Sequence, residues 1–178
     1  MKKTVFLVIT LVLALSLLCG CTSSSYAPDG MKLLESSDKL DYNIYIPAGW
    51  VQDLSTGAVS AYVSSNDLSN VSMTQFNLEE LKKLDEYVSD YITELEENLQ
   101  NFKLKEGYPE NGKTILNGVE AAKIEYTAKL VGNEYKFMQI ICVKGGTIYY
   151  FTYTALAEAY DSHLEAVEQI LDNFSFKK

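Results

Sequence analysis

The sequence predicts an α+β domain in which helices cover a mostly antiparallel sheet. Three consecutive segments, 119–130, 134–143 and 147–155, alternate apolar and polar residues, and short glycine-bearing turns connect them. Two further segments, 77–102 and 157–172, repeat apolar residues at helical spacing. Because each of these helices must bury its apolar face against a sheet, the elements together predict a layered domain.

The N-terminus has the pattern of an export signal. Lys2 and Lys3 precede an apolar run over 5–18, which at 14 residues is shorter than the roughly 20 that a membrane-spanning helix needs. Leu18-Cys19-Gly20-Cys21 resembles the bacterial lipobox, in which the last cysteine receives a diacylglyceryl thioether and the peptide is cut before it. We therefore expect a lipoprotein signal peptide at 1–20, a lipidated tether at 21–30 and a domain at 31–178.

The first half of the domain is expected to contain three short strands and a long helix. The strands cover 42–47, where Pro47 ends the ladder, 58–64 and 71–77. The helix opens at Asn77, with Glu80 three residues later as a capping-box variant. Its apolar stripe could be a coiled-coil seam, but the stripe lasts only about three heptads, which favours packing on a sheet. Acidic residues crowd the rest of its surface.

The second half begins with an expected strand at 102–106 and a break at Gly107-Tyr108-Pro109. Asn117-Gly118 then marks the turn that enters the three alternating segments. The final helix at 157–172 presents Tyr160, Leu164 and Val167 on its buried side, and Phe174 follows it.

Charge and composition narrow the classes of partner. Removal of Lys2 and Lys3 with the signal would leave 13 lysines against 24 acids, a net charge near −11, and the chain has no arginine. Such an acidic chain is a poor ligand for nucleic acid, and it lacks the bidentate clamp that arginine offers to phosphate. Membrane attachment is therefore expected to come from the lipid on Cys21.

Cysteine and histidine are too few for a typical metal or nucleophile site. Cys142 is the thiol that remains after processing, and its apolar strand favours a buried, inert side chain over a reactive nucleophile. His163 is the single histidine, and its helical spacing from Tyr160 favours a boundary position over a ligand or catalytic role. No calcium loop, Gly-x-Ser-x-Gly motif or phosphate loop occurs. We expect no catalytic residue, no metal and no cofactor.

Tyrosine is abundant, with 13 residues, and it is enriched at protein interfaces. Most of these rings could instead fill a core that is short of other aromatic residues. The candidate interaction surface consists of Tyr149, Tyr153, Tyr87, Tyr91 and Trp50.

Several segments resemble the PsbP-like family. The strand–Pro–Gly–Trp opening is Ile44-Tyr45-Ile46-Pro47-Ala48-Gly49-Trp50, and Asn117-Gly118-Val119-Glu120-Ala121 is similar to the family's strand entry. The run 149–155, the last helix and Phe174-Ser175-Phe176 complete the resemblance. It implies an antiparallel sheet sandwiched between helical layers. It also implies binding or assembly work more than catalysis, and it carries over no site residues.

The expected function is a lipid-anchored, extracytoplasmic binding or assembly module with no catalysis. Its partners would be the membrane, through Cys21, and an envelope protein. The alternative is a small-molecule-binding accessory lipoprotein of a transporter, for which a closed aromatic pocket would be the signature. An enzyme with a dispersed site ranks last.

Overall fold

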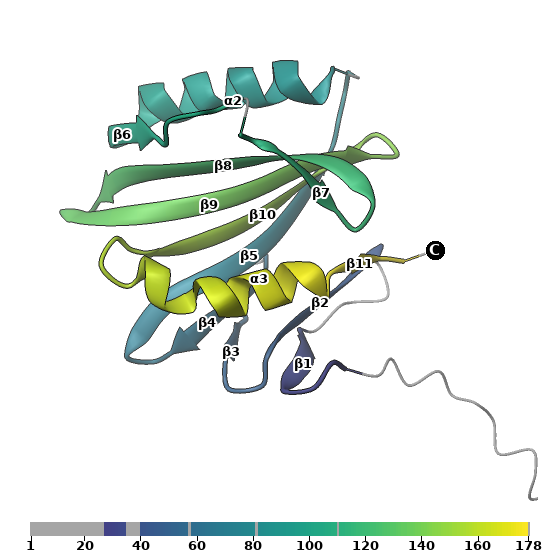
Figure 1. Cartoon of the computed structure of the whole chain (residues 1–178), viewed down its shortest axis with the longest axis vertical. Coiled ribbons are helices and arrows are strands. Elements are labelled where there is room, and N and C mark those ends of the chain that lie inside the picture. Colours follow the sequence, from purple (N-terminus) through teal and green to yellow (C-terminus); the bar gives the residue numbers. More distant parts are fainter. Residues whose placement is uncertain (1–26, 35–39, 57, 81, 110, 178) are drawn as a thin grey trace, which may run out of the picture.

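The computed structural model describes residues 27–34, 40–56, 58–80, 82–109 and 111–177. Within them a large antiparallel sheet lies between two helical layers, with α2 (Leu84–Asn98) on one face and α3 (Leu164–Asp172) on the other (Figure 1). The predicted α+β sandwich is therefore confirmed. The predicted signal peptide and the lipidation site at Cys21 lie outside the described residues.

The large sheet has eight strands in the order β3-β4-β5-β10-β9-β8-β6, and β7 also pairs with β8. Its described strands all pair in antiparallel fashion. The bounds are β3 (Val51–Asp53), β4 (Val59–Ser64), β5 (Asp67–Asn77), β6 (Gln100–Leu104), β7 (Lys113–Leu116), β8 (Val119–Leu130), β9 (Asn133–Lys144) and β10 (Thr147–Leu156).

A second, three-stranded sheet lies on the α3 side of the molecule. It has the order β1-β2-β11, with β1 (Met31–Leu34), β2 (Tyr42–Pro47) and β11 (Ser175–Phe176). The C-terminal strand is tied to β2 by the pairs Ser175↔Asn43 and Phe176↔Tyr42. The first and last strands, β1 and β11, therefore belong to the same small sheet, one on each side of β2.

Alternation along the strands divides the core into two layers. On β10, Tyr149, Phe151 and Tyr153 face the α3 side, where they join Val167 and Ile170 of α3. The neighbouring Ile148 and Tyr150 face the α2 side with Val88. Both faces of the central strands are buried, because each is covered by its own helical layer.

The predicted long helix begins and ends at different residues from those expected. β5 continues to Asn77, which pairs with Thr147, and the Leu78 amide donates to the Gly146 carbonyl at 2.8 Å. Because residue 77 belongs to this ladder, α2 begins only at Leu84, and the capping box at 77–80 was a wrong prediction. The helix ends before the extended Leu99, so the strand predicted at 102–106 is β6 at Gln100–Leu104.

The last helix also differs at its start. The Ala157 amide donates to the Glu134 carbonyl at 3.0 Å, which keeps the chain against β9. A 3₁₀ turn, η1 (Tyr160–His163), then leads into α3. The helix predicted from 157 is therefore α-helical only from Leu164.

Candidate functional site

Helix α2 is held on the sheet by a narrow inner stripe. Val88 is its one fully buried side chain among those described, and Tyr87 and Tyr91 lie beside it over Tyr150. The Tyr150 hydroxyl donates to Tyr87, and Gln139 Nε2 donates to the Tyr91 hydroxyl at 3.1 Å. Leu84, Ile92 and Leu95 are half-buried against the same core layer, and the exposed surface of the helix is largely acidic.

An open cleft of about 680 Å³ runs between α2 and the segment that follows β6. We call it the helix cleft. Its apolar lining comes from Ile92, Leu104, Tyr108 and Pro109, and its polar lining from Asp85, Ser89, Thr93 and Lys113. Asp85 and Lys113 form no ion pair among the described residues. The cleft therefore offers one free anion and one free cation above an apolar floor.

The outer wall of the helix cleft is a compact turn at 107–112. The Asn111 amide donates to the Gly107 carbonyl at 2.8 Å, and the Gly112 amide donates to the Pro109 carbonyl at 3.0 Å. A Cβ at Gly112 would lie 2.5 Å from the Tyr108 ring, so only glycine lets that ring lie flat against the turn. This close approach holds the Tyr108 ring in place as a wall of the cleft. The peptide bond before Pro109 is cis.

A second, more polar cleft of about 320 Å³ lies on the other side of the same turn. We call it the polar cleft. It is lined by Lys105, Glu106, Tyr108, Asn111, Gly112, Lys123, Ile124 and Glu125. Tyr108 thus borders both clefts.

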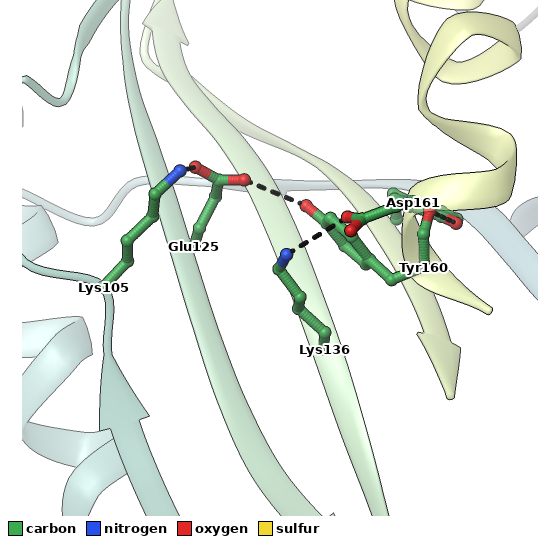
Figure 2. A network of polar contacts seen from close by, with 6 residues as sticks. Lys105, Glu125, Lys136, Tyr160 and Asp161 are labelled. Atoms are coloured by element: carbon green, nitrogen blue, oxygen red, sulfur yellow. Dashed lines mark hydrogen bonds and ion pairs between the residues drawn. The ribbon is translucent and has the colours of Figure 1, made fainter. Parts of the chain in front are cut away.

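Glu125 links the polar cleft to the α3 side of the sheet, as Figure 2 shows. Its carboxylate accepts from Lys105 Nζ and, at 3.1 Å, from the Tyr160 hydroxyl. Lys136 Nζ lies 4.1 Å from the centre of the Tyr160 ring and 3.4 Å from Asp161 Oδ1. The residue after β6, the strands β8 and β9, and η1 are therefore joined by one polar network.

The electrostatics of this network favour an ionised carboxylate. Burial acts to raise the pKa of Glu125, but the hydrogen bond from Lys105 and the charges of Lys123 and Lys105 outweigh it, and the pKa is lowered. Burial, followed by the charge of Glu125, raises the pKa of Tyr160 far above its ordinary value. Tyr160 consequently stays protonated and donates its hydrogen bond to Glu125.

His163 occupies a boundary position, as its sequence spacing indicated. Its Nε2 lies 2.7 Å from Asp67 Oδ2, and its ring meets Trp50 edge-on at 6.2 Å between centroids. The hydrogen bond from Ser69 lowers the pKa of Asp67 most, with a smaller contribution from His163. No group of metal-ligating side chains occurs within the part of the chain that is described.

Three members of the predicted interaction surface lie in the core. Tyr149 is 1% exposed, Tyr153 is fully buried and Trp50 is 6% exposed. The Tyr149 hydroxyl donates to Asp41, and that of Tyr153 donates to the Tyr160 carbonyl at 2.8 Å. Each ring fills space between the large sheet and the α3 layer, so these three side chains are not part of an exposed surface.

Tyr87 and Tyr91 remain accessible at the edge of α2. They border a shallow acidic cleft of about 340 Å³ together with Leu78, Glu79, Glu80, Lys82, Asp90 and Glu94. Their part in an interaction stays a prediction. Cys142 is fully buried, and this burial raises its pKa to about 11.

Sequence reasoning did not find the residues that line the helix cleft. Asp85 was counted only among the acids of a solvated helix face, and Tyr108 only as part of a chain break. Asp85 and Tyr108 line the same cleft only because β6 and β7 fold back beside α2. Local sequence patterns do not predict this tertiary arrangement. The glycines at 107 and 112 around Tyr108-Pro109 are the signal that could have marked a structured turn.

Comparisons with known proteins agree on the fold. A family model described as PsbP-like protein matches residues 22–176. Curated protein sequences gave no significant match. Within the described residues, no helix is long and apolar enough to cross a membrane.

Three solved structures share this architecture at low sequence identity. A Pseudomonas aeruginosa protein of unknown function, PA94, described as a putative regulator, has a TM-score of 0.58 and 18% identity, covering 83% of this chain and 98% of its own. The cyanobacterial PsbP of Synechocystis has a TM-score of 0.58 and 14% identity, with 89% and 98% covered. LpqN of Mycobacterium tuberculosis, involved in cell envelope biogenesis, has a TM-score of 0.53 and 15% identity, with 86% and 82% covered. The chain belongs to the PsbP-like family.

Proposed function

We propose that this protein is a lipid-anchored extracytoplasmic accessory module that holds an envelope protein in the helix cleft. The observation that carries the proposal is the cleft itself, which places Asp85 and Lys113, neither of them in an ion pair with another described residue, around Ile92, Leu104 and Tyr108. An apolar floor with a few placed polar groups is the usual composition of a binding site.

The form of the cleft favours a macromolecular partner. It is open along α2, so a segment of another protein could lie in it without displacing any described element. Tyr108 adds a rigid aromatic wall, the type of residue that anchors many protein interfaces. Asp85 and Lys113 would then fix the orientation of the partner through complementary charges.

The anchor is supported by the lipobox-like run ending at Cys21 and by the envelope role described for the structurally similar LpqN. Enzymatic activity has no such support, since the polar network around Glu125 uses its groups to pair with one another. The proposed role is therefore binding without turnover.

Crosslinking in intact cells tests this function. A photoreactive residue at Ser89, which is exposed and lines the helix cleft, should capture one dominant envelope protein. The matched control is a photoreactive residue at Glu97, which is exposed on the same helix and outside the cleft. The Cys21→Ala variant should lose the product. Equal capture from both positions would refute a partner in the cleft.

The alternative is a small amphipathic ligand in the same cleft, which has a volume within the range of about 300–1,000 Å³ typical of ligand sites. Ile92→Trp would fill part of the cleft and should abolish such binding. A thermal-shift screen of the protein against envelope metabolites would detect it, since a ligand at 100 times its Kd stabilises the fold by about 2.7 kcal/mol. A hit that Ile92→Trp abolishes, without a crosslinked protein, would favour this alternative.

A further inference from the structure

The end of the large sheet at β3, β4 and β5 carries apolar side chains outside the two core layers. Val51 is 40% exposed and Leu68 is 71% exposed. Val51 pairs with Tyr62, and Tyr62 pairs with Asn70. Leu68 comes two residues before Asn70, where the β4–β5 register shifts between Tyr62 and Ser64. Val51, Tyr62 and Leu68 thus gather at this end of the sheet, and we call this cluster the apolar edge.

The apolar edge lies on a part of the sheet that α2 leaves uncovered. Ala61, next to Tyr62, belongs to the α3-side core, so Tyr62 and its neighbours face the other side. On that side α2 packs over β6, β8 and β9. Figure 1 shows β3 and β4 at the opposite end of the molecule from α2. No described element covers the cluster.

The chain enters the domain next to the apolar edge. The Ala48 amide donates to the Gly30 carbonyl at 2.8 Å, and Lys32 Nζ donates to the Trp50 carbonyl at 2.6 Å. These bonds fix the first described residues to the turn between β2 and β3, and Val51 follows directly on that turn. An anchor at the N-terminus would therefore keep the apolar edge close to the anchoring point.

The length of the entering chain restricts what can cover the edge. Only residues 22–26 separate Cys21 from the first described residue, Ala27. The six Cα–Cα steps from Cys21 to Ala27 can extend to a maximum of about 20 Å. A lipid on Cys21 would thus keep Ala27 within about 20 Å of the bilayer, and the apolar edge follows the turn that Gly30 and Lys32 contact. This step rests on the proposed lipid anchor.

We infer that the apolar edge contacts the bilayer and fixes the orientation of the domain on the membrane. Val51 and Leu68 would enter the boundary between headgroups and acyl chains, and Tyr62 would lie at the headgroup level, where aromatic rings with a polar tip are favoured. Electrostatic attraction to the membrane does not drive the contact, because the acidic residues Asp53 and Asp67 flank the cluster and are not attracted to neutral or anionic headgroups. The helix cleft then faces away from the membrane, toward a partner.

Lipid quenching of a fluorophore tests the contact on the lipoprotein reconstituted into neutral phosphatidylcholine vesicles. Leu68→Cys would carry an environment-sensitive label. The matched control is Ile115→Cys on β7, because Ile115 is also 71% exposed. Cys142 is fully buried and should stay unlabelled. With brominated acyl chains, the label at 68 should be quenched at least about twofold more than the label at 115.

Two further arms separate apolar contact from other causes. Val51→Thr should reduce the quenching at 68, and about 0.5 M NaCl should leave it unchanged, since screening acts on charges. Equal quenching at 68 and 115, or loss of the difference in salt, would overturn the inference. Vesicle flotation and the mass of the Cys21 peptide test the anchor separately, so a chain that floats without selective quenching refutes only the apolar contact.

Discussion

Replacing Val88 by alanine should weaken the attachment of α2 and, with it, the helix cleft. Val88 is the one fully buried side chain among the described residues of this helix. Loss of two methyl carbons costs about 1.6 kcal/mol in transfer free energy. The cavity left against Ile141 and Tyr150 raises the expected loss of unfolding free energy to about 2–3 kcal/mol.

Urea unfolding followed by circular dichroism measures the loss, with Ser89→Ala as the control. Ser89 is the next residue and is exposed, so its replacement should change the unfolding free energy by less than about 0.5 kcal/mol. Hydrogen exchange should show that amides of α2 lose more protection in Val88→Ala than amides of β9 and β10. A loss below about 0.5 kcal/mol with unchanged exchange would refute the assignment of Val88 as the anchor of this layer.

Other predictions concern the polar network and the buried thiol. Tyr160→Phe keeps the ring against Lys136 but removes the hydrogen bond to Glu125, so urea unfolding should show a loss of about 1–2 kcal/mol, and no loss would contradict a role for that bond. Because the pKa of Glu125 is lowered in the folded state, its stabilisation is present above the ordinary value of 4.5 and declines as pH falls below it. Glu125→Gln should therefore flatten the acid side of the stability profile, and an unchanged profile would count against the shift. Cys142, with a pKa of about 11 and no exposure, should react with a thiol reagent only after denaturation, and rapid reaction of the native protein would show that this core opens.

The central meander was predictable because its signals are local. The expected strands at 119–130, 134–143 and 147–155 correspond to β8, β9 and β10 within one residue at each end. Alternation sets the two faces of each strand, and Gly132, Gly145 and Gly146 adopt the positive φ that tight hairpin turns need. These residues specify the turns without reference to distant parts of the chain.

The missed elements depend on contacts far along the sequence. The strands β1, β3 and β7 have three or four residues each, too few for a period to emerge, and they exist because β2, β4 and β8 offer them an edge. Residue 77 has a good capping side chain, yet its pairing with Thr147 keeps it extended. The helix cleft was missed for the same reason, since its two walls meet only through tertiary packing.

The prediction that Tyr149 and Tyr153 are exposed was wrong, because it inferred exposure from residue type alone. Tyr149 and Tyr153 alternate onto the α3 side of β10, a face that is buried along most of its length. Their hydroxyls find partners inside, on Asp41 and on the Tyr160 carbonyl. A tyrosine-rich strand therefore indicates an aromatic core as readily as a surface.

Tyr108 gives the two clefts a residue in common. Its ring rests on Gly112, and Tyr108 lines both the helix cleft and the polar cleft. A side chain larger than hydrogen at position 112 would displace the ring, and a small residue at position 108 would remove it from both linings. The apolar groove and the polar groove therefore cannot be reshaped independently at this turn.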